Sequence, residues 1–260
     1  MSEDSQSSID VRRIASSVGE RRGWDFSRVR DARDPVPWEY VEVVLRFVRQ
    51  TSRVLDIGTG GGEYFLSLAP HFGDGIGIDS SPSMIQVAHE NTPKTLAGKI
   101  SFEVMDARNL GFPDAMFDVV LNRHAPVFPA EIVRVLRPQG IFITQQVGER
   151  NMKNICSIFG CRPGGKYKSN PEQSVDALIE RFKQNGCDLV ARAEYEVRYW
   201  FLDVKSLIFL LKAVPLPEDF DIAKHQRQVE EIITKYHTPK GIETKEHRKL
   251  LILQKCCEDT

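Results

Sequence analysis

The segment from Arg53 to Glu63 constrains the fold of this chain more than any other. It reads RVLDIGTGGGE: an apolar stretch that ends in an acid, three glycines at alternate positions, and the start of a run with helical character. A buried strand, a glycine turn and a helix, in this order, form the first unit of a doubly wound α/β sheet, where ligands bind at the carboxyl ends of the strands. Glycine is needed because the turn is tight and a ligand approaches the bare backbone.

The residue identities in this turn indicate which ligand it holds. The dinucleotide pattern G-x-G-x-x-G is matched by Gly58 and Gly60, but the third glycine, which lets helix and strand pack closely, would fall at Glu63. Asp56 precedes the glycines, and its carboxylate would repel a pyrophosphate at the helix N-terminus. It suits a ligand with a positive ammonium or sulfonium. The absence of G-K-[ST] excludes a Walker-type phosphate loop.

The same stretch resembles motif I of the class I S-adenosylmethionine (SAM) methyltransferases, D-x-G-x-G-x-G, at Asp56, Gly58, Gly60 and Gly62. Four more segments resemble the later strands of this family in the expected order; they are residues 75–79, 100–107, 117–122 and 136–143. The resemblance covers residues 37–146, and it is closest to the broad UbiE-like, methyltransferase type 11 group, whose members act on many substrates.

The resemblance implies the fold and its organisation. We expect an α/β fold with a doubly wound, seven-stranded, mostly parallel sheet, an antiparallel last strand, helices on both faces and a lid or insertion region. Residues 1–36 are expected to form an N-terminal tail and lid segment, and residues 37–147 the SAM-binding core. Residues 148–260 would supply a substrate-side loop and helices, with strands six and seven completing the same domain.

The resemblance also assigns contacts to SAM, whose product would be S-adenosyl-L-homocysteine. Asp79 resembles the acid that binds both ribose hydroxyls, and Asp106 resembles the acid that faces the adenine amino group. Met84 follows Asp79 closely enough to touch the adenine, although a methionine here also serves as core filler. The expected cofactor-binding residues are Asp56, Gly58, Thr59, Gly60, Asp79, Ser80, Met84, Asp106, Ala107 and Asn122.

Residues 122–126 follow the fourth predicted strand, where an acceptor should meet the methyl group of SAM. They read NRHAP. Methylases of exocyclic nucleobase amines carry [DNS]-P-P-[FYW] here and cytosine C5 methylases carry Pro-Cys, so both chemistries lack support. His124 is the candidate catalytic base, because it titrates near neutrality; the alternative is that it only bonds backbone or covers SAM.

Four residues are candidate substrate contacts: Trp24, Phe26, Arg123 and Gln146. Trp24 and Phe26 either belong to a lid or simply anchor the N-terminal segment to the domain. Tyr195 and Tyr199 could line the acceptor pocket, although packing on a sheet explains them equally well. The cations Arg162, Lys166 and Lys168 could meet an anionic substrate or belong to a solvated loop.

The remaining chain predicts elements that elaborate the sheet. Hydrophobic periodicity predicts further helices and strands; they are a short helix within 152–159, a helix at 171–185, a strand at 188–201, a helix at 222–236 and a last strand at 249–254. The strongly apolar segment 203–214 and the helix after it lie where this family often carries a substrate-covering insertion.

Charge and cysteine content exclude other classes of protein. The formal net charge is -1, so there is no global attraction to nucleic acid or an anionic membrane. The five cysteines show no zinc spacing, so we expect no metal site, reduced thiols and a cytoplasmic location. No apolar run approaches the ~18–20 residues of a membrane span. We expect the other five histidines to be exposed; they are His71, His89, His225, His237 and His247.

We therefore expect a SAM-dependent methyltransferase that moves a methyl group to an O or N atom of a small molecule by in-line displacement. Such an enzyme supplies chiefly alignment and exclusion of water. The alternatives are a methyltransferase acting on RNA or a peptide, a nicotinamide-dependent oxidoreductase, and a SAM-binding protein without catalysis. The sequence predicts neither the acceptor nor the oligomeric state.

Overall fold

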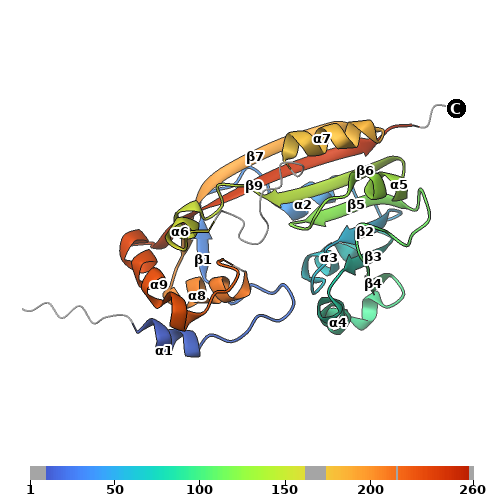
Figure 1. Cartoon of the computed structure of the whole chain (residues 1–260). Coiled ribbons are helices and arrows are strands. Elements are labelled where there is room, and N and C mark those ends of the chain that lie inside the picture. Colours follow the sequence, from blue (N-terminus) through green and yellow to red (C-terminus); the bar gives the residue numbers. More distant parts are fainter. Residues whose placement is uncertain (1–9, 162–173, 215, 258–260) are drawn as a thin grey trace, which may run out of the picture.

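A computed structural model describes residues 10–161, 174–214 and 216–257, which form one mixed sheet with helices on both faces (Figure 1). The strands are β1 (Asp31–Arg33), β2 (Arg53–Ile57), β3 (Asp74–Asp79), β4 (Ile100–Val104), β5 (Phe117–Arg123), β6 (Leu136–Val147), β7 (Cys187–Phe201), β8 (His237–Thr238) and β9 (Gly241–Lys255). The α-helices are α1 (Val11–Ser16), α2 (Tyr40–Leu45), α3 (Glu63–Leu68), α4 (Pro82–Asn91), α5 (Pro129–Val135), α6 (Lys153–Ile158), α7 (Val175–Gln184), α8 (Val204–Ala213) and α9 (Ile222–Tyr236). Two short 3₁₀ helices are η1 (Ala69–His71) and η2 (Lys94–Leu96).

The strand order is β1-β7-β9-β6-β5-β2-β3-β4, with β8 paired to β9. The strands from β4 to β6 are parallel, and β9 runs antiparallel to both β6 and β7. The mixed α/β sheet was predicted, but the count of seven strands was wrong, since the described residues form nine. The two extra strands, β1 and β8, are three and two residues long, too short to show a periodic pattern.

Alternate residues of the central strands face opposite layers of helices, as the pleat of a strand requires. On one face, Leu55 of β2 belongs to a buried cluster that includes Ile132 of α5 and Phe182 of α7. On the other face, Val54 packs in a cluster with residues of α2, α3 and α4, among them Phe65. Both faces of the parallel sheet are therefore buried, and ligands can reach it only at the strand ends.

A third buried cluster forms a separate helical lobe, on the left of Figure 1. It unites α1, α6, α8 and α9 with the far ends of β7 and β9. These two strands stay paired from Cys187 and Lys255 to Phe201 and Ile242, whereas β6 accompanies β9 only between Ile141 and Val147. The ribbon of β7 and β9 thus continues beyond the parallel sheet, is joined at its far end by β1 and β8, and carries the lobe.

Two boundaries differ from those predicted. The last strand was predicted at 249–254 and begins instead at Gly241, because Glu246 and other polar residues of β9 are buried through ion pairs. The predicted helix 171–185 is described from Ser174, whose side chain caps α7, and Gly186 follows it at φ +80°. Arg162, Lys166 and Lys168 lie outside the described residues.

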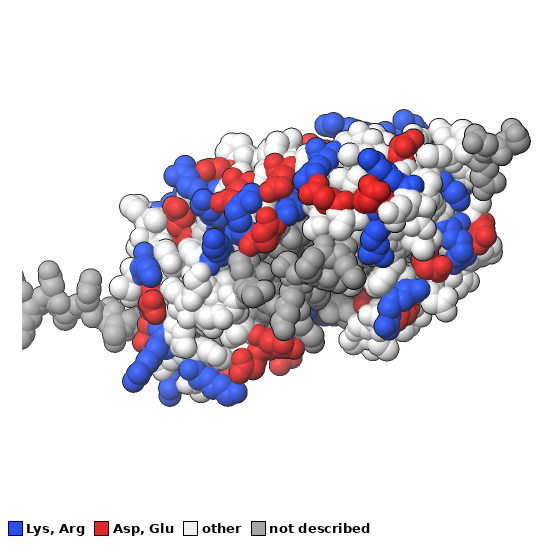
Figure 2. Space-filling view, turned by 45° about the horizontal axis from the view of Figure 1, so that its top comes forward, with Lys and Arg blue, Asp and Glu red and all other residues white. Residues whose placement is uncertain are grey.

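The surface carries both signs of charge. On the face shown in Figure 2, the side chains of Lys and Arg alternate with those of Asp and Glu. None of the helices in the described part of the chain has the length and apolar content that a membrane span needs.

Candidate active site

The glycine turn between β2 and α3 has the backbone conformation that only glycine adopts readily. Gly58, Gly60 and Gly62 have φ of +75°, +59° and +77°. The N–H groups of Gly58 and Thr59 both donate to the Ile78 carbonyl at 2.9 Å, which fixes the turn against β3. A Cβ on Gly58 would lie 2.4 Å from the Ala125 Cβ, so the turn also touches the loop after β5.

Three acids stand at the carboxyl ends of the neighbouring strands β2, β3 and β4. Asp79 accepts hydrogen bonds from the Gly60 N–H at 3.0 Å and the Ser81 N–H at 2.9 Å, one on each oxygen. Each oxygen keeps a lone pair for a ligand hydroxyl. Asp106 is exposed and bonded to Arg108, and that guanidinium lowers the pKa of Asp106 to about 2.

Asp56 differs from the other two acids because it is almost fully buried, with 9% of its surface exposed. Burial raises the pKa of Asp56 to about 7, although Thr59 and the Arg123 guanidinium oppose this. A buried acid beside bare glycine backbone favours a positively charged ligand and disfavours one that carries a diphosphate. The donor set of the turn therefore fits SAM, which carries an ammonium and a sulfonium.

The other residues predicted to contact the cofactor lie around the same edge. Ser80 is exposed between β3 and α4, and Met84 is partly buried in the first turn of α4. Ala107 packs against the core beside Met105. Asn122 is fully buried, and its amide N–H donates to the Pro126 carbonyl at 3.1 Å, so its side chain supports the loop after β5.

Gln146 was predicted as a substrate contact, and its amide nitrogen is already bonded within the protein. It donates to Asn122 Oδ1 at 2.8 Å, to the Ala125 carbonyl at 3.0 Å and to Thr144 Oγ1 at 2.8 Å. With both amide hydrogens engaged, only the Gln146 carbonyl oxygen is left for a ligand.

His124 takes a left-handed backbone conformation, with φ +64°. The Trp38 Nε1–H donates to Gln145 Oε1 at 3.1 Å, which turns the Gln145 amide N–H toward His124 Nε2 at 3.5 Å. His124 Nε2 is therefore the acceptor of a neutral ring. Burial, helped by Arg248 and Arg123, holds the pKa of His124 well below its ordinary value.

Trp24 and Phe26 lie between the glycine turn and the helical lobe. The Trp24 backbone N–H donates to Glu63 Oε1 at 2.8 Å, and a Cβ on Gly60 would lie 3.2 Å from the Trp24 Cβ. The Phe26 ring meets the Phe209 ring of α8 edge-on at 6.2 Å. The two aromatic residues thus connect two parts of the molecule that are distant in sequence.

A pocket of about 100 Å³ opens beside this edge. Its lining residues come from six regions of the chain; they are Arg33, Trp38, Glu39, Tyr40, Val41, Tyr64, Arg123, Gln145, Tyr195 and Glu246. The sequence predicted Arg123 as a substrate contact and Tyr195 as a possible pocket residue, but no local motif pointed to the other lining residues. Tyr199 does not line this pocket, and its hydroxyl donates instead to Asp31 Oδ2 at 2.5 Å.

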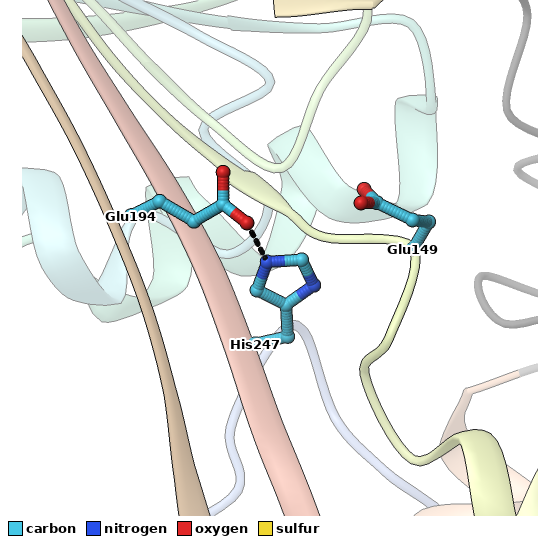
Figure 3. Close-up of side chains that lie close together, drawn as sticks. All are labelled: Glu149, Glu194 and His247. Carbon is cyan, nitrogen blue, oxygen red and sulfur yellow. Dashed lines mark hydrogen bonds and ion pairs between the residues drawn. The ribbon is translucent and has the colours of Figure 1, made fainter.

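His247 was predicted to be exposed, and this was wrong: its ring is fully buried. Its Nδ1 accepts from the Arg150 N–H at 3.0 Å, and its Nε2 lies 2.7 Å from Glu194 Oε1 (Figure 3). Glu149 completes a group of three potential metal ligands. Arg150 pairs with Glu194 at 2.7 Å and Lys249 pairs with Glu149, so cations already neutralise both acids. We assign no metal to this cluster.

Comparison with known proteins agrees with this geometry. Residues 54–140 match the sequence model of a family described as "Methyltransferase domain". The chain is 36% identical over 172 residues to 2-methyl-6-phytyl-1,4-hydroquinone methyltransferase of Synechocystis, covering 58% of this chain and 54% of that protein. It is 33% identical over 165 residues to the ubiquinone/menaquinone biosynthesis C-methyltransferase UbiE of Ectopseudomonas mendocina, covering 57% and 64%. The chain thus spans between half and two thirds of the length of these relatives.

The solved structure of the YcgJ protein from Bacillus subtilis shares the fold, with a TM-score of 0.57 and 18% identity over 85% of this chain and 99% of that one. The matched residues contain the glycine turn, the acids at the strand ends and His124. Residues 54–140 are therefore a methyltransferase domain of the class I SAM-dependent type, an enzyme domain whose cofactor is SAM.

Proposed function

We propose that this protein transfers the methyl group of SAM to an oxygen or nitrogen atom of a small-molecule acceptor. One relationship carries the proposal: the acid-lined glycine turn and the aromatic pocket meet at the end of β5, where Arg123 lines the pocket and Ala125 touches Gly58. A cofactor on the turn and an acceptor in the pocket would therefore approach each other at residues 123–125.

Several residues of this chain would hold SAM, which supplies an electrophilic methyl group when bound. Asp79 has oxygen lone pairs for ribose hydroxyls, and Asp56 offers a buried negative charge to the cationic end. Asp106 would turn from Arg108 toward the adenine amino group. The bare backbone of Gly58 and Gly60 allows close approach of the ligand.

The N-terminal segment would act as a lid. Trp24 lies over Gly60, and Phe26 ties the same segment to α8 of the helical lobe. Covering the glycine turn would exclude water from the place where the acceptor and the methyl group of SAM meet. The contacts of Trp24 and Phe26 support this role, since Trp24 contacts the glycine turn and Phe26 contacts α8.

His124 would accept the proton of the acceptor. Its ring is neutral at physiological pH because its pKa is depressed, and its acceptor nitrogen Nε2 would exchange the Gln145 amide N–H at 3.5 Å for the proton of the acceptor. A low pKa also makes the ring a weak base. His124 would therefore serve acceptors with an acidic proton, such as a phenol, better than an alcohol.

A second candidate is methylation of a carbon atom. Two relatives are named as a hydroquinone methyltransferase and a quinone-pathway C-methyltransferase. Removing a proton from a phenol also makes the neighbouring ring carbons nucleophilic, so the same base and pocket would serve both outcomes.

The test is incubation of the protein with methyl-labelled SAM and separated metabolite, RNA and peptide fractions. We expect label in a small molecule, and the ¹³C shift of the new methyl group would separate O-, N- and C-methylation. Label confined to RNA or peptide would contradict the proposal. Parallel titration with NADH and S-adenosyl-L-homocysteine addresses the oxidoreductase alternative.

A further inference from the structure

The pocket beside the proposed reaction edge has aromatic walls. Trp38 and Tyr195 meet edge-on with their ring centres 4.6 Å apart, and Tyr64 stands with 43% of its surface exposed. Aromatic walls of this kind favour a flat, apolar ligand, because ring contacts add to the burial of apolar surface. A cavity of roughly 150 Å³ holds benzene, so a ligand with one ring would fill a pocket of about 100 Å³ and extend out of its mouth.

Most charges around this pocket compensate one another. Glu246 accepts from Arg33 Nη1 at 3.0 Å and pairs with Arg248 Nη2 at 2.8 Å. Arg33 is also bonded to Glu39. The Tyr195 hydroxyl donates to Glu246 at 3.3 Å. Two arginines and two glutamates therefore form a set with no net charge.

Arg123 is the exception. It has no ion pair with any residue in the ranges that the structure describes, and its guanidinium stacks on the Tyr64 ring with 3.7 Å between guanidinium carbon and ring centre. Its Nε is buried and has no acceptor within those ranges. The charge of Arg123 reaches Asp56, but the two make no ion pair. Among the described residues, Arg123 is thus the one cation lining the pocket that has no ion pair.

Stacking on Tyr64 also fixes how this charge is presented. A guanidinium held flat against a ring keeps its N–H groups pointing outward in its own plane, the geometry that pairs with a planar carboxylate. An N–H without an acceptor carries a desolvation cost that an incoming anion would remove.

We propose that the acceptor is a single-ring aromatic anion whose carboxylate pairs with Arg123 while its ring packs against the side chains of Trp38, Tyr64 and Tyr195. This inference rests on the proposed function, since it names the chemical class of the acceptor. Anchoring the carboxylate at Arg123 would leave the rest of the ring to face the glycine turn, which the neighbouring loop residue Ala125 touches.

The experiment compares benzoate with its neutral analogue benzamide, using the full chain saturated with S-adenosyl-L-homocysteine. Binding is followed by tryptophan fluorescence, because Trp38 lines the pocket, and by calorimetry. The test variants are Arg123→Gln and Arg123→Lys. The matched control is Arg192→Gln, which makes the same charge change at a half-exposed arginine that pairs with Asp176 and does not line the pocket.

We expect the unaltered chain and the control to bind benzoate at least about tenfold more tightly than benzamide. Arg123→Gln should lose this preference, and Arg123→Lys should keep part of it. Equal binding of the two probes by the unaltered chain, or an undiminished preference in Arg123→Gln, would overturn the inference. Failure to bind S-adenosyl-L-homocysteine would instead contradict the proposed function, so the two results are distinguishable.

Discussion

The carboxylate of Asp79 accepts the backbone N–H of Gly60 at 3.0 Å and so ties the end of β3 to the glycine turn of β2. The same carboxylate holds the start of α4 through the Ser81 N–H at 2.9 Å. One side chain therefore sets the spacing between two strand ends at which a nucleoside would lie.

Replacing Asp79 by alanine should weaken binding of S-adenosyl-L-homocysteine by about 1–3 kcal/mol, the scale of losing hydrogen bonds to a charged acceptor. Calorimetry would measure the change. Asp74→Ala is the matched control, because Asp74 begins the same strand and pairs only with Arg53 at 3.0 Å in the described residues. Unchanged affinity in Asp79→Ala would contradict the ribose role.

Asp56→Asn should stabilise the protein at alkaline pH. The folded-state pKa of Asp56 is raised from 3.8 to about 7, so ionisation of this acid favours the unfolded state. Below about pH 4 the acid is protonated in both states and the substitution should have little effect. As pH rises through about 7, the free energy of unfolding of the wild type falls because Asp56 must ionise while buried. At pH 8 the variant, which does not ionise there, should be more stable by about 2–4 kcal/mol. Denaturant unfolding at pH 4 and pH 8 tests this, and a constant difference would contradict it.

Cofactor affinity should depend on pH through the same residue. The α-ammonium group of the ligand favours ionised Asp56, so affinity for S-adenosyl-L-homocysteine should increase as pH rises through about 7, the pKa of Asp56 in the free protein. Asp56→Asn should bind more weakly and show a flatter pH profile. Calorimetry across this pH range would measure the affinity. An equal dependence of affinity on pH in the wild type and in Asp56→Asn would show that Asp56 is not its source.

His124→Gln should lower turnover by about 10²–10⁴-fold if the ring acts as a base, with little change in cofactor affinity. Because the pKa of His124 is held well below its ordinary value, its protonation should not reduce the rate near pH 6.5. His124→Asn is a useful companion, since asparagine tolerates the left-handed backbone at φ +64° and controls for strain. Full turnover in either variant would exclude the base role.

Gly58→Ala should destabilise the fold more than Gly98→Ala. Both glycines have left-handed φ, which costs an alanine about 1–2 kcal/mol. A Cβ at Gly58 would also overlap Ala125 at 2.4 Å, whereas a Cβ at Gly98 meets nothing within 4 Å. Thermal unfolding of the two variants separates strain from overlap, and equal losses would show that the turn and the loop after β5 do not press together.

Local patterns predicted the parts of this molecule whose signals are local. The strand, glycine turn and helix around Asp56 formed as expected, because apolar periodicity and left-handed glycines act within a few residues. The N-terminal half of β9 was missed because Glu246 suggests a solvated face, and its burial depends on partners from β1 and β7. His247 was misjudged for the same reason, since Glu194 lies 53 residues away.

The pocket shows the limit of sequence patterns most clearly. Trp38, Tyr64 and Tyr195 come from three distant parts of the chain, and only the folded sheet brings them together. Arg123 was predicted because it lies at the carboxyl end of a strand, but its lack of an anionic partner within the described residues depends on the whole neighbourhood.

The ribbon of paired strands β7 and β9 joins the core of the parallel sheet to the core of the helical lobe, as Figure 1 shows. A bend in this ribbon would move α8 and α9 relative to the glycine turn, while every backbone hydrogen bond between β7 and β9 stayed intact. Trp24, which lies against the glycine turn, and Phe26, which contacts α8, would then limit how far the helical lobe moves from the turn.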